Sequence, residues 1–259
     1  MDGNIHFNAA TKFALSIVYI CTLFSPTLNT DQKSIEVFIA DGDSAFVKFE
    51  NELALEYYQK ALNLDPKEYH AIWRCGRVYV EIGEHLPKDQ QLFYYRKAEI
   101  MADSAISVNP RGYEGHTYRA IAFGKIALFK GVWKSIGLAK NIRKELEIAL
   151  ELNPDDDIAL YVYGRTHQKI AEKGKLFRYP LGLGWASKKK AKEYYEAALK
   201  FRPNLVLYNI DYARLLVQLK KFEDAREVLT NIPSMHITDQ DDEWNKGNAS
   251  KLLQEISAK

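Results

Sequence analysis

The stretch ALEYYQKALNLDP (residues 54–66) places two alanines seven positions apart and a proline five positions after the second alanine. Residues seven apart share one face of an α-helix, and alanine on that face lets a partner helix approach closely. Proline cannot continue the helix, so it marks the turn that follows. The stretch therefore predicts a helix that packs closely against a partner and ends before Pro66.

The same frame returns three more times along the chain. Its two alanines and its proline recur at Ala98, Ala105 and Pro110, at Ala191, Ala198 and Pro203, and, with Ile142 in place of the first alanine, at Ala149 and Pro154. Self-similarity of this kind is the sequence signature of a helical-repeat protein.

A second helix is expected before each copy of the frame. Residues 72–79 carry a tryptophan, a glycine and a tyrosine, residues 160–164 (LYVYG) repeat the glycine, and residues 206–225 give a last repeat of unmodified length. Such pairs, with W-x2-L-G-x2-Y before A-x6-A-x4-P, are typical of tetratricopeptide repeats. We therefore predict an all-α, right-handed tetratricopeptide-type solenoid of antiparallel helix pairs, with about five repeats in residues 31–233.

The two helices of a pair are unusually far apart in sequence. The common repeat separates the glycine from the first alanine by about twelve positions, whereas Gly76 and Ala98 are 22 apart and Gly164 and Ala191 are 27 apart. Because these insertions all fall between paired helices, they should lie along one edge of the solenoid, where we expect a binding surface.

The insertions differ in character. Residues 92–95 (LFYY) and 126–129 (IALF) are apolar at helical spacing and are expected to lengthen the helices. Residues 174–187 contain glycines and a proline, which predicts a loop.

The chain ends in a predicted capping helix. Within residues 234–259, a polar linker leads to an amphipathic stretch, 243–257, that contains Trp244, Leu252, Leu253 and Ile256. A terminal helix with one polar face closes the last repeat of an open stack.

The N-terminus resembles an export signal. Residues 13–24 form an apolar run with Lys12 before it and polar residues after it. The run is too short to span a bilayer comfortably, so no integral membrane span is expected. We predict that residues 1–30 are a signal peptide or targeting segment of a periplasmic or secreted protein, although no A-x-A site is present and a buried helix of a cytoplasmic protein is the alternative.

Composition excludes several classes of partner and of stabilisation. The 259 residues contain 36 Lys and Arg against 34 Asp and Glu, so nucleic acid is not an expected partner. Cys21 and Cys75 match no zinc or redox spacing, and Cys75 is best explained as a small buried hydrophobe.

No catalytic or cofactor motif is evident. The six histidines include no pair at the spacing of a helical metal site, and neither a Walker loop nor G-x-S-x-G occurs. The sequence therefore predicts a protein that is not an enzyme and has no metal or cofactor. Lys188, Lys189 and Lys190 are explained either by a solvated face or by contact with a phosphate or a lipid.

Three arginines occupy the same inward position of their repeats: Arg77, Arg165 and Arg214. The guanidinium group matches a carboxylate with a fork of donors, so the stack would suit an acidic peptide or a free peptide carboxylate. In the alternative, each arginine pairs with a glutamate of the neighbouring repeat.

Other candidate partner-binding residues flank the arginines or lie in the insertions. Trp73, Thr117 and Tyr161 stand one turn before the inward arginine position. Trp133 and Trp185 lie in insertions, where each could anchor a partner or cover the end of a lengthened helix. The predicted function is a protein-binding or peptide-binding scaffold of undetermined oligomeric state.

The phrases YYQKALNLDPKEYHAIWRCGRVYVEIGE (57–84) and ALELNPDDDIALYVYGR (149–165) give the chain a more specific resemblance. Over roughly residues 45–256 it resembles the regulator of microtubule dynamics family and its bacterial relatives. The resemblance implies no catalytic residues. It also implies an alternative function, a cytoskeletal or organelle-membrane-associated regulator, as for the eukaryotic members.

Overall fold

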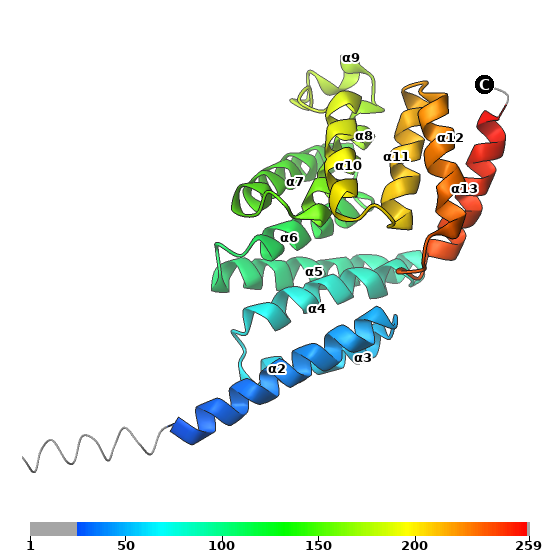
Figure 1. The fold of residues 1–259 in the computed structure, drawn as a ribbon. Coiled ribbons are helices and arrows are strands. Elements are labelled where there is room, and N and C mark those ends of the chain that lie inside the picture. The colour runs from blue at the N-terminus through cyan, green and yellow to red at the C-terminus, as the bar shows by residue number, and fades with distance from the viewer. Residues whose placement is uncertain (1–24, 258–259) are drawn as a thin grey trace, which may run out of the picture.

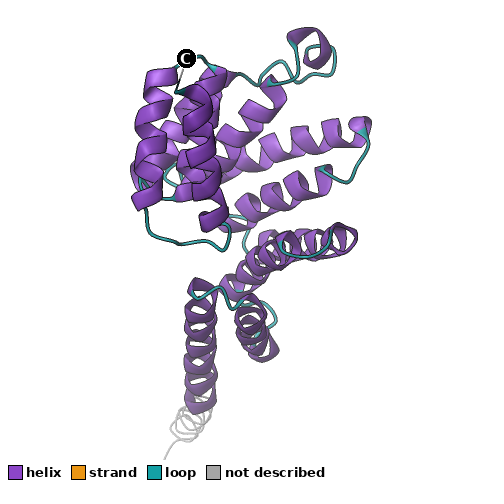
Figure 2. Cartoon of the chain, turned by 90° about the vertical axis from the view of Figure 1, so that its right-hand side faces the viewer, coloured by secondary structure: helices purple, strands orange, loops and turns teal. Residues whose placement is uncertain are grey.

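The computed structural model describes residues 25–257, and its regular elements are helices arranged as consecutive antiparallel pairs (Figures 1 and 2). The pairs are α2 (Ser25–Val47) with α3 (Asn51–Leu64), α4 (Tyr69–Glu84) with α5 (Lys88–Val108), α6 (Tyr113–Ala127) with α7 (Val132–Leu152), α8 (Asp157–Ala171) with α10 (Lys188–Phe201), and α11 (Val206–Gln218) with α12 (Phe222–Asn231). The short helix α9 (Lys175–Arg178) interrupts the fourth pair, and α13 (Asp242–Ile256) ends the stack after the 3-10 turn η1 (Ile232–Ser234). The predicted all-α helical-repeat solenoid is confirmed.

The repeated alanines are the points of closest helix approach. The alanines of the frame are all at most 1% exposed: Ala54, Ala61, Ala98, Ala105, Ala149, Ala191 and Ala198. A Cβ on Gly164 would lie 3.2 Å from the carbonyl oxygen of Ala191, and one on Gly76 would lie 3.6 Å from that of Ala98. Glycine on the first helix and alanine on the second therefore allow the two backbones of a pair to approach closely.

The prolines of the frame follow a repeated helix end. Helices α3, α5, α7 and α10 each end two residues before their proline. The residue between helix and proline donates its N–H to the carbonyl of the second alanine, at 3.0 Å from Asp65 to Ala61 and 2.8 Å from Asn109 to Ala105. This bond closes the helix, and the proline then prevents its continuation.

The insertions lengthen two helices and add one loop. Helices α5 and α7 have 21 residues each, whereas α3 and α10 have 14. Seven extra residues extend a helix by about 10 Å. Residues 92–95 lie in α5 as predicted, but only the first half of 126–129 is helical, because α6 ends at Ala127 and Gly131 begins α7 as its N-cap. Residues 174–187 form the predicted loop, with one helical turn.

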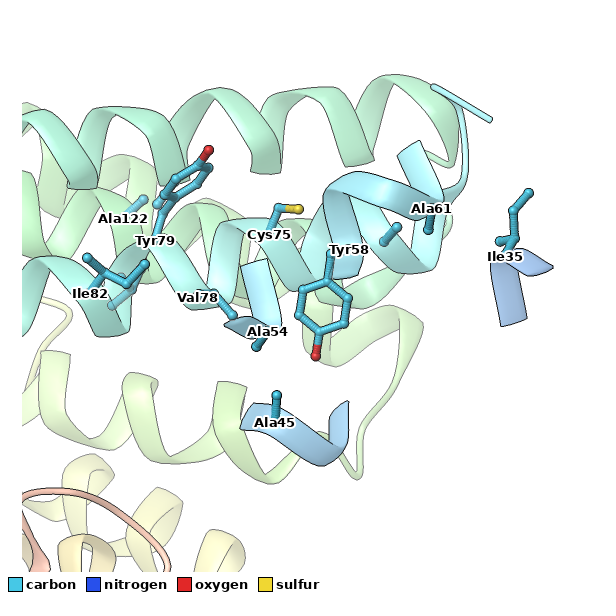
Figure 3. Packing of buried hydrophobic residues seen from close by; sticks show 13 residues of the cluster. Ile35, Ala45, Ala54, Tyr58, Ala61, Cys75, Val78, Tyr79, Ile82 and Ala122 are labelled. Carbon is cyan, nitrogen blue, oxygen red and sulfur yellow. The ribbon is translucent and has the colours of Figure 1, made fainter. Parts of the chain in front are cut away.

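The core is a chain of small clusters along the stack. In the first cluster the ring of Tyr58 is fully buried beside Ala54 and Ala45, and Val78 comes in from α4 (Figure 3). Cys75 is buried in the same cluster as a free thiol, as predicted.

The two ends of the chain differ in what the structure describes. The apolar run of residues 13–24 lies outside the described residues. Helix α2 begins at Ser25, before the end of the predicted targeting segment at residue 30. Among the described residues, no helix is long and apolar enough to cross a membrane.

Helix α13 caps the stack. Ala249 and Ile256 are buried, and Leu252 and Leu253 pack against the last pair. Trp244 is instead exposed, because the inward face of α13 passes through Asn245 and Ala249.

Candidate functional site

The structure divides the predicted arginines into two groups on the first helices of the pairs. Arg77 lies on α4 beside Trp73, where it contacts α2 and α3. Arg165 on α8 and Arg214 on α11 meet at a single carboxylate, that of Asp211.

Arg77 makes its polar contacts within the protein. Its Nη2 donates to Asp43 at 3.1 Å and to the Tyr58 hydroxyl at 3.0 Å, and its guanidinium lies over the ring of Phe46. Burial alone would raise the pKa of Asp43, but the hydrogen bonds from Arg74 and Tyr58, with the charges of Arg74 and Arg77, hold it below its ordinary value. Arg77 therefore fixes α2 and α3 against α4.

Three further candidate residues are buried between helices. Trp73 stacks on the Tyr118 ring at 5.5 Å. Thr117, 1% exposed, donates its hydroxyl to Asp156 at 2.6 Å, and Asp156 also caps α8. Tyr161 donates to Asp211 at 2.8 Å and stacks on Tyr208 at 4.3 Å. Their observed contacts are internal, and of the three only Tyr161 reaches the second arginine group.

The second arginine group is open to solvent. The side chains of Arg165 and Arg214 are 46% and 37% exposed, whereas that of Asp211 is 10% exposed. Arg214 Nη1 donates to Asp211 at 2.8 Å, and Arg165 Nε lies 3.7 Å from the same carboxylate. One carboxylate therefore orients two guanidinium groups without using all of their donors.

These arginines line a cavity of about 300 Å³ between α8, α11 and α13, whose lining residues are Arg165, Gln168, Lys169, Asp211, Arg214, Val217, Gln218 and Leu252. At its edge Glu172 pairs with Lys169 at 3.4 Å and accepts from Gln218 Nε2 at 2.9 Å. The Oε1 atom of Gln218 is buried and has no hydrogen-bond partner in the described part of the chain. The cavity thus combines guanidinium donors with an apolar wall formed by Val217 and Leu252.

The linker before α13 crosses to the other end of the solenoid. Gln240 Nε2 donates to the carbonyl of Phe49 at 3.3 Å, and Asn51 Nδ2 donates to Gln240 Oε1 at 3.4 Å. His85 lies 3.7 Å from Asp241. Figure 1 shows this linker passing the ends of α4 and α5. The linker, residues 235–241, therefore joins the first two pairs to the last.

Charged groups of both signs lie near the linker. Burial, with the charge of Asp239, raises the pKa of Glu81. Burial, followed by the charge of Arg165, lowers the pKa of Lys125 to about 8, although Lys125 also pairs with Glu84. Lys125 is partly buried, and an incoming carboxylate near it would stabilise its charged form and raise its pKa again.

The two insertion tryptophans have different surroundings. Trp185 packs against Tyr163 and His167 of α8, and Arg143 of α7 lies over its ring at 5.1 Å, so it contacts the middle of these two helices. Trp133, in the first turn of α7, is 79% exposed.

Sequence reasoning missed the carboxylates and the linker contact. Asp211 stands three positions before Arg214 on one helix, a spacing that places both side chains on one face and could have identified the pair. Asn51 and Gln240 are 189 positions apart, and no local pattern connects them.

No cluster of three or more potential metal-ligating side chains occurs within residues 25–257.

Comparisons with known proteins agree on one family. The model of the family described as Regulator of microtubule dynamics protein 1-3 matches residues 38–257. Regulator of microtubule dynamics protein 1 of Bos taurus is 22% identical over 206 residues, which cover 75% of this chain and 64% of that protein. Protein 2 of Mus musculus is 25% identical over 126 residues, 48% of this chain and 28% of that protein. The chain thus spans less than two thirds of the length of these relatives.

Solved structures show the same fold. A thermophilic TPR protein of Thermus thermophilus superposes with a TM-score of 0.64 at 15% identity, covering 83% of this chain and 98% of that one. PilF of Pseudomonas aeruginosa gives a TM-score of 0.55 at 14% identity, covering 88% of this chain and 89% of that one. The solenoid is therefore of the tetratricopeptide type.

Proposed function

The chain belongs to the regulator of microtubule dynamics family, and on that premise we propose that it is a non-enzymatic scaffold whose inner surface binds an extended segment of a partner protein. The observation that carries the proposal is the cavity in which Arg165 and Arg214 share the single carboxylate of Asp211. A solenoid groove of this kind gains affinity from many modest contacts along an extended segment.

The cavity favours an acidic segment or a free α-carboxylate. An incoming carboxylate would accept from the unused guanidinium donors of Arg165 and Arg214, an arrangement that arginine makes in bidentate form. An apolar side chain of the ligand would lie on Val217 and Leu252. Nucleic acid does not fit, because Glu81, Asp211 and Asp239 would repel its phosphates.

Fluorescence polarisation with synthetic peptides tests this binding. The probes are eight-residue peptides of increasing acidic content, each made both with a free α-carboxylate and as the amide. We expect binding to increase with acidic content and Arg214→Gln to weaken it roughly tenfold, because one charge-assisted pair is lost.

A charge-matched variant controls for the change in net charge. Arg111→Gln removes the same charge from an exposed residue in the turn after α5 and should leave binding unchanged. Equal loss in the two variants, or equal affinity for acidic and neutral peptides, would contradict a specific carboxylate site.

Export from a bacterial cell is a further part of the proposal and rests on the apolar run of residues 13–24. Mass spectrometry of the protein isolated from its own host should find a mature N-terminus near residue 28. An intact Met1 would contradict export and favour a cytoplasmic location.

A second candidate function is regulation of the cytoskeleton or at an organelle membrane. The names of the family relatives, regulators of microtubule dynamics, favour its cytoskeletal form. Co-sedimentation with polymerised tubulin tests its cytoskeletal form. Saturable binding that Arg214→Gln weakens would support this function, whereas protein that stays in the supernatant would leave the peptide scaffold as the better account.

A further inference from the structure

The basic residues of the chain are unevenly distributed. Residues 115–144 contain seven Lys and Arg and no Asp or Glu, and residues 173–192 likewise contain seven and none. These two segments hold 14 of the 36 basic residues and none of the 34 acidic ones. A nearly neutral protein therefore has two strongly cationic segments and an acidic remainder.

Both segments contain a connection between the two helices of a pair. The first includes the α6–α7 turn, and the second includes the loop that carries α9. Figure 1 shows α9 beyond the outer ends of α8 and α10. The loop also reaches α7, because Gly182 lies against the side chain of Lys140. The α9 loop therefore lies against α7, the helix that follows the first connection, and we name the two connections together the basic edge: residues 128–140 and 173–190.

Large apolar side chains project from the basic edge. Leu176 is 96% exposed and Trp133 79%, and Leu128, Phe177 and Tyr179 are each more than half exposed. Exposed apolar side chains of this size close together commonly mark an interaction surface.

The loop is built to present these side chains. Arg178 is buried beneath them, and its Nη1 donates to the carbonyls of Ala186, Leu183 and Gly184. Leu183 and Ala186 are buried on the inner side of the same loop. The outward position of Leu176, Phe177 and Tyr179 is therefore fixed by a packed loop and is not a consequence of missing contacts.

Most cations of the basic edge are available to a partner. Lys130, Lys134, Lys140, Lys173, Lys175 and Lys189 make no ion pair within the described residues, whereas Lys190 pairs with Glu193. An anionic surface could approach these lysines without displacing an internal carboxylate.

We propose that the basic edge binds the surface of an anionic lipid bilayer, with Leu176, Phe177 and Trp133 entering the headgroup region and the lysines contacting lipid phosphates. Apolar side chains that project from a protein and are flanked by lysines suit a bilayer interface. There the burial of apolar surface and the attraction of the lysines to anionic lipids both favour binding. A protein partner would more commonly fill a concave site, and Leu176, 96% exposed, does not line the cavity of Arg165 and Arg214. The cavity of Arg165 and Arg214 adjoins one end of the basic edge, because Lys188 Nζ donates to the carbonyl of Gln218, a residue that lines the cavity.

Vesicle co-sedimentation of the full chain tests the proposal. The vesicles are phosphatidylcholine alone and phosphatidylcholine mixed with phosphatidylglycerol. We expect binding to the mixed vesicles that added salt weakens. The double variant Leu176→Ser/Phe177→Ser and the double variant Lys173→Gln/Lys175→Gln should each lose roughly tenfold in affinity. These side chains are largely exposed, so the substitutions should leave the circular dichroism spectrum unchanged.

Matched controls separate the edge from the rest of the chain, including residues 1–24. Trp244→Ser removes an exposed tryptophan of α13. The double variant Lys67→Gln/Lys200→Gln removes one lysine from the turn between α3 and α4 and one from the last turn of α10, both outside the basic edge. Both controls should bind as the unchanged protein does. The proposal fails if the edge variants bind vesicles as well as the controls do. It also fails if the edge variants lose binding to polyglutamate while keeping vesicle binding, which would identify an acidic protein as the partner.

Discussion

The buried imidazole of His167 makes the stability of the α9 loop dependent on pH. Its Nδ1 accepts the backbone N–H of Ser187 at 3.3 Å, and its ring packs among Tyr163, Trp185 and Tyr194. Burial, followed by the charges of Lys190 and Arg143, lowers its pKa to about 4.

The sign of the effect follows from the depressed pKa. Between the ordinary pKa of 6.5 and about 4, the unfolded chain binds a proton at His167 that the folded chain does not. The free energy of unfolding should therefore fall as the pH drops through this window, by up to about 1.4 kcal/mol per pH unit from this group. Urea denaturation at a series of pH values should show a shallower fall for His167→Gln, which keeps an acceptor but not the titration. Identical pH profiles would mean that His167 titrates in the folded protein as it does in the unfolded one.

Thr117 connects two repeats through one hydrogen bond. Thr117→Val keeps the shape of the side chain but removes the hydroxyl that donates to the buried carboxylate of Asp156. Because Asp156 also caps α8, we expect a loss of about 1–3 kcal/mol in the free energy of unfolding. Thr117→Ser keeps the donor and should lose less. Chemical denaturation of the two variants distinguishes the hydrogen bond from the lost methyl group.

At the scale of elements, glycine serves close packing in some helices and has no packing role in others. A Cβ on Gly42 of α2 would lie 2.4 Å from the buried ring of Tyr58, whereas one on Gly137 of α7 would meet nothing within 4 Å. Gly42→Ala should therefore destabilise the protein by about 1–3 kcal/mol through overpacking. Gly137→Ala should stabilise it by about 0.5–1 kcal/mol, because alanine restricts the unfolded chain and favours helix. Thermal denaturation of both variants checks the two signs, and a stable Gly42→Ala protein would mean that α2 can move away from α3.

The helix pairs could be predicted from the sequence because their determinants are local. Ala54 and Ala61 share a helix face, and Pro66 ends that helix whatever the rest of the chain does. The residues at which the prediction failed depend on packing between elements. The turn at Leu128 and the exposure of Trp244 follow from how neighbouring helices meet, which hydrophobicity alone does not encode.

At the scale of the whole molecule, the candidate site could be predicted only in part. The repeat frame placed Arg165 and Arg214 on the inner face, but not the sharing of Asp211 between two repeats, which depends on the angle between α8 and α11. Arg77 received the same prediction, yet it pairs with Asp43, 34 positions earlier on α2. An equal position in the repeat therefore does not imply an equal environment, because each repeat has different neighbours.

Closure of the solenoid by the linker is the feature with the longest sequence separation, and it can be tested directly. With Cys21→Ser and Cys75→Ala as background, a short bismaleimide should join Asn51→Cys to Gln240→Cys within one chain, because their native side chains are in hydrogen-bond contact. The control pair is Lys67→Cys with Gln240→Cys. Lys67 precedes α4, whose 16 residues place its two ends about 24 Å apart, and the linker contacts the far end, at His85.

Peptide mapping should find the first crosslink at a rate independent of protein concentration and the second only weakly. Equal rates would mean that the ends of the solenoid separate in solution. A dominant first crosslink would mean that the linker stays in place in solution. A peptide would then reach the inner surface either beside residues 235–241 or by displacing them. The crosslinked protein would keep peptide binding in the first case and lose it in the second.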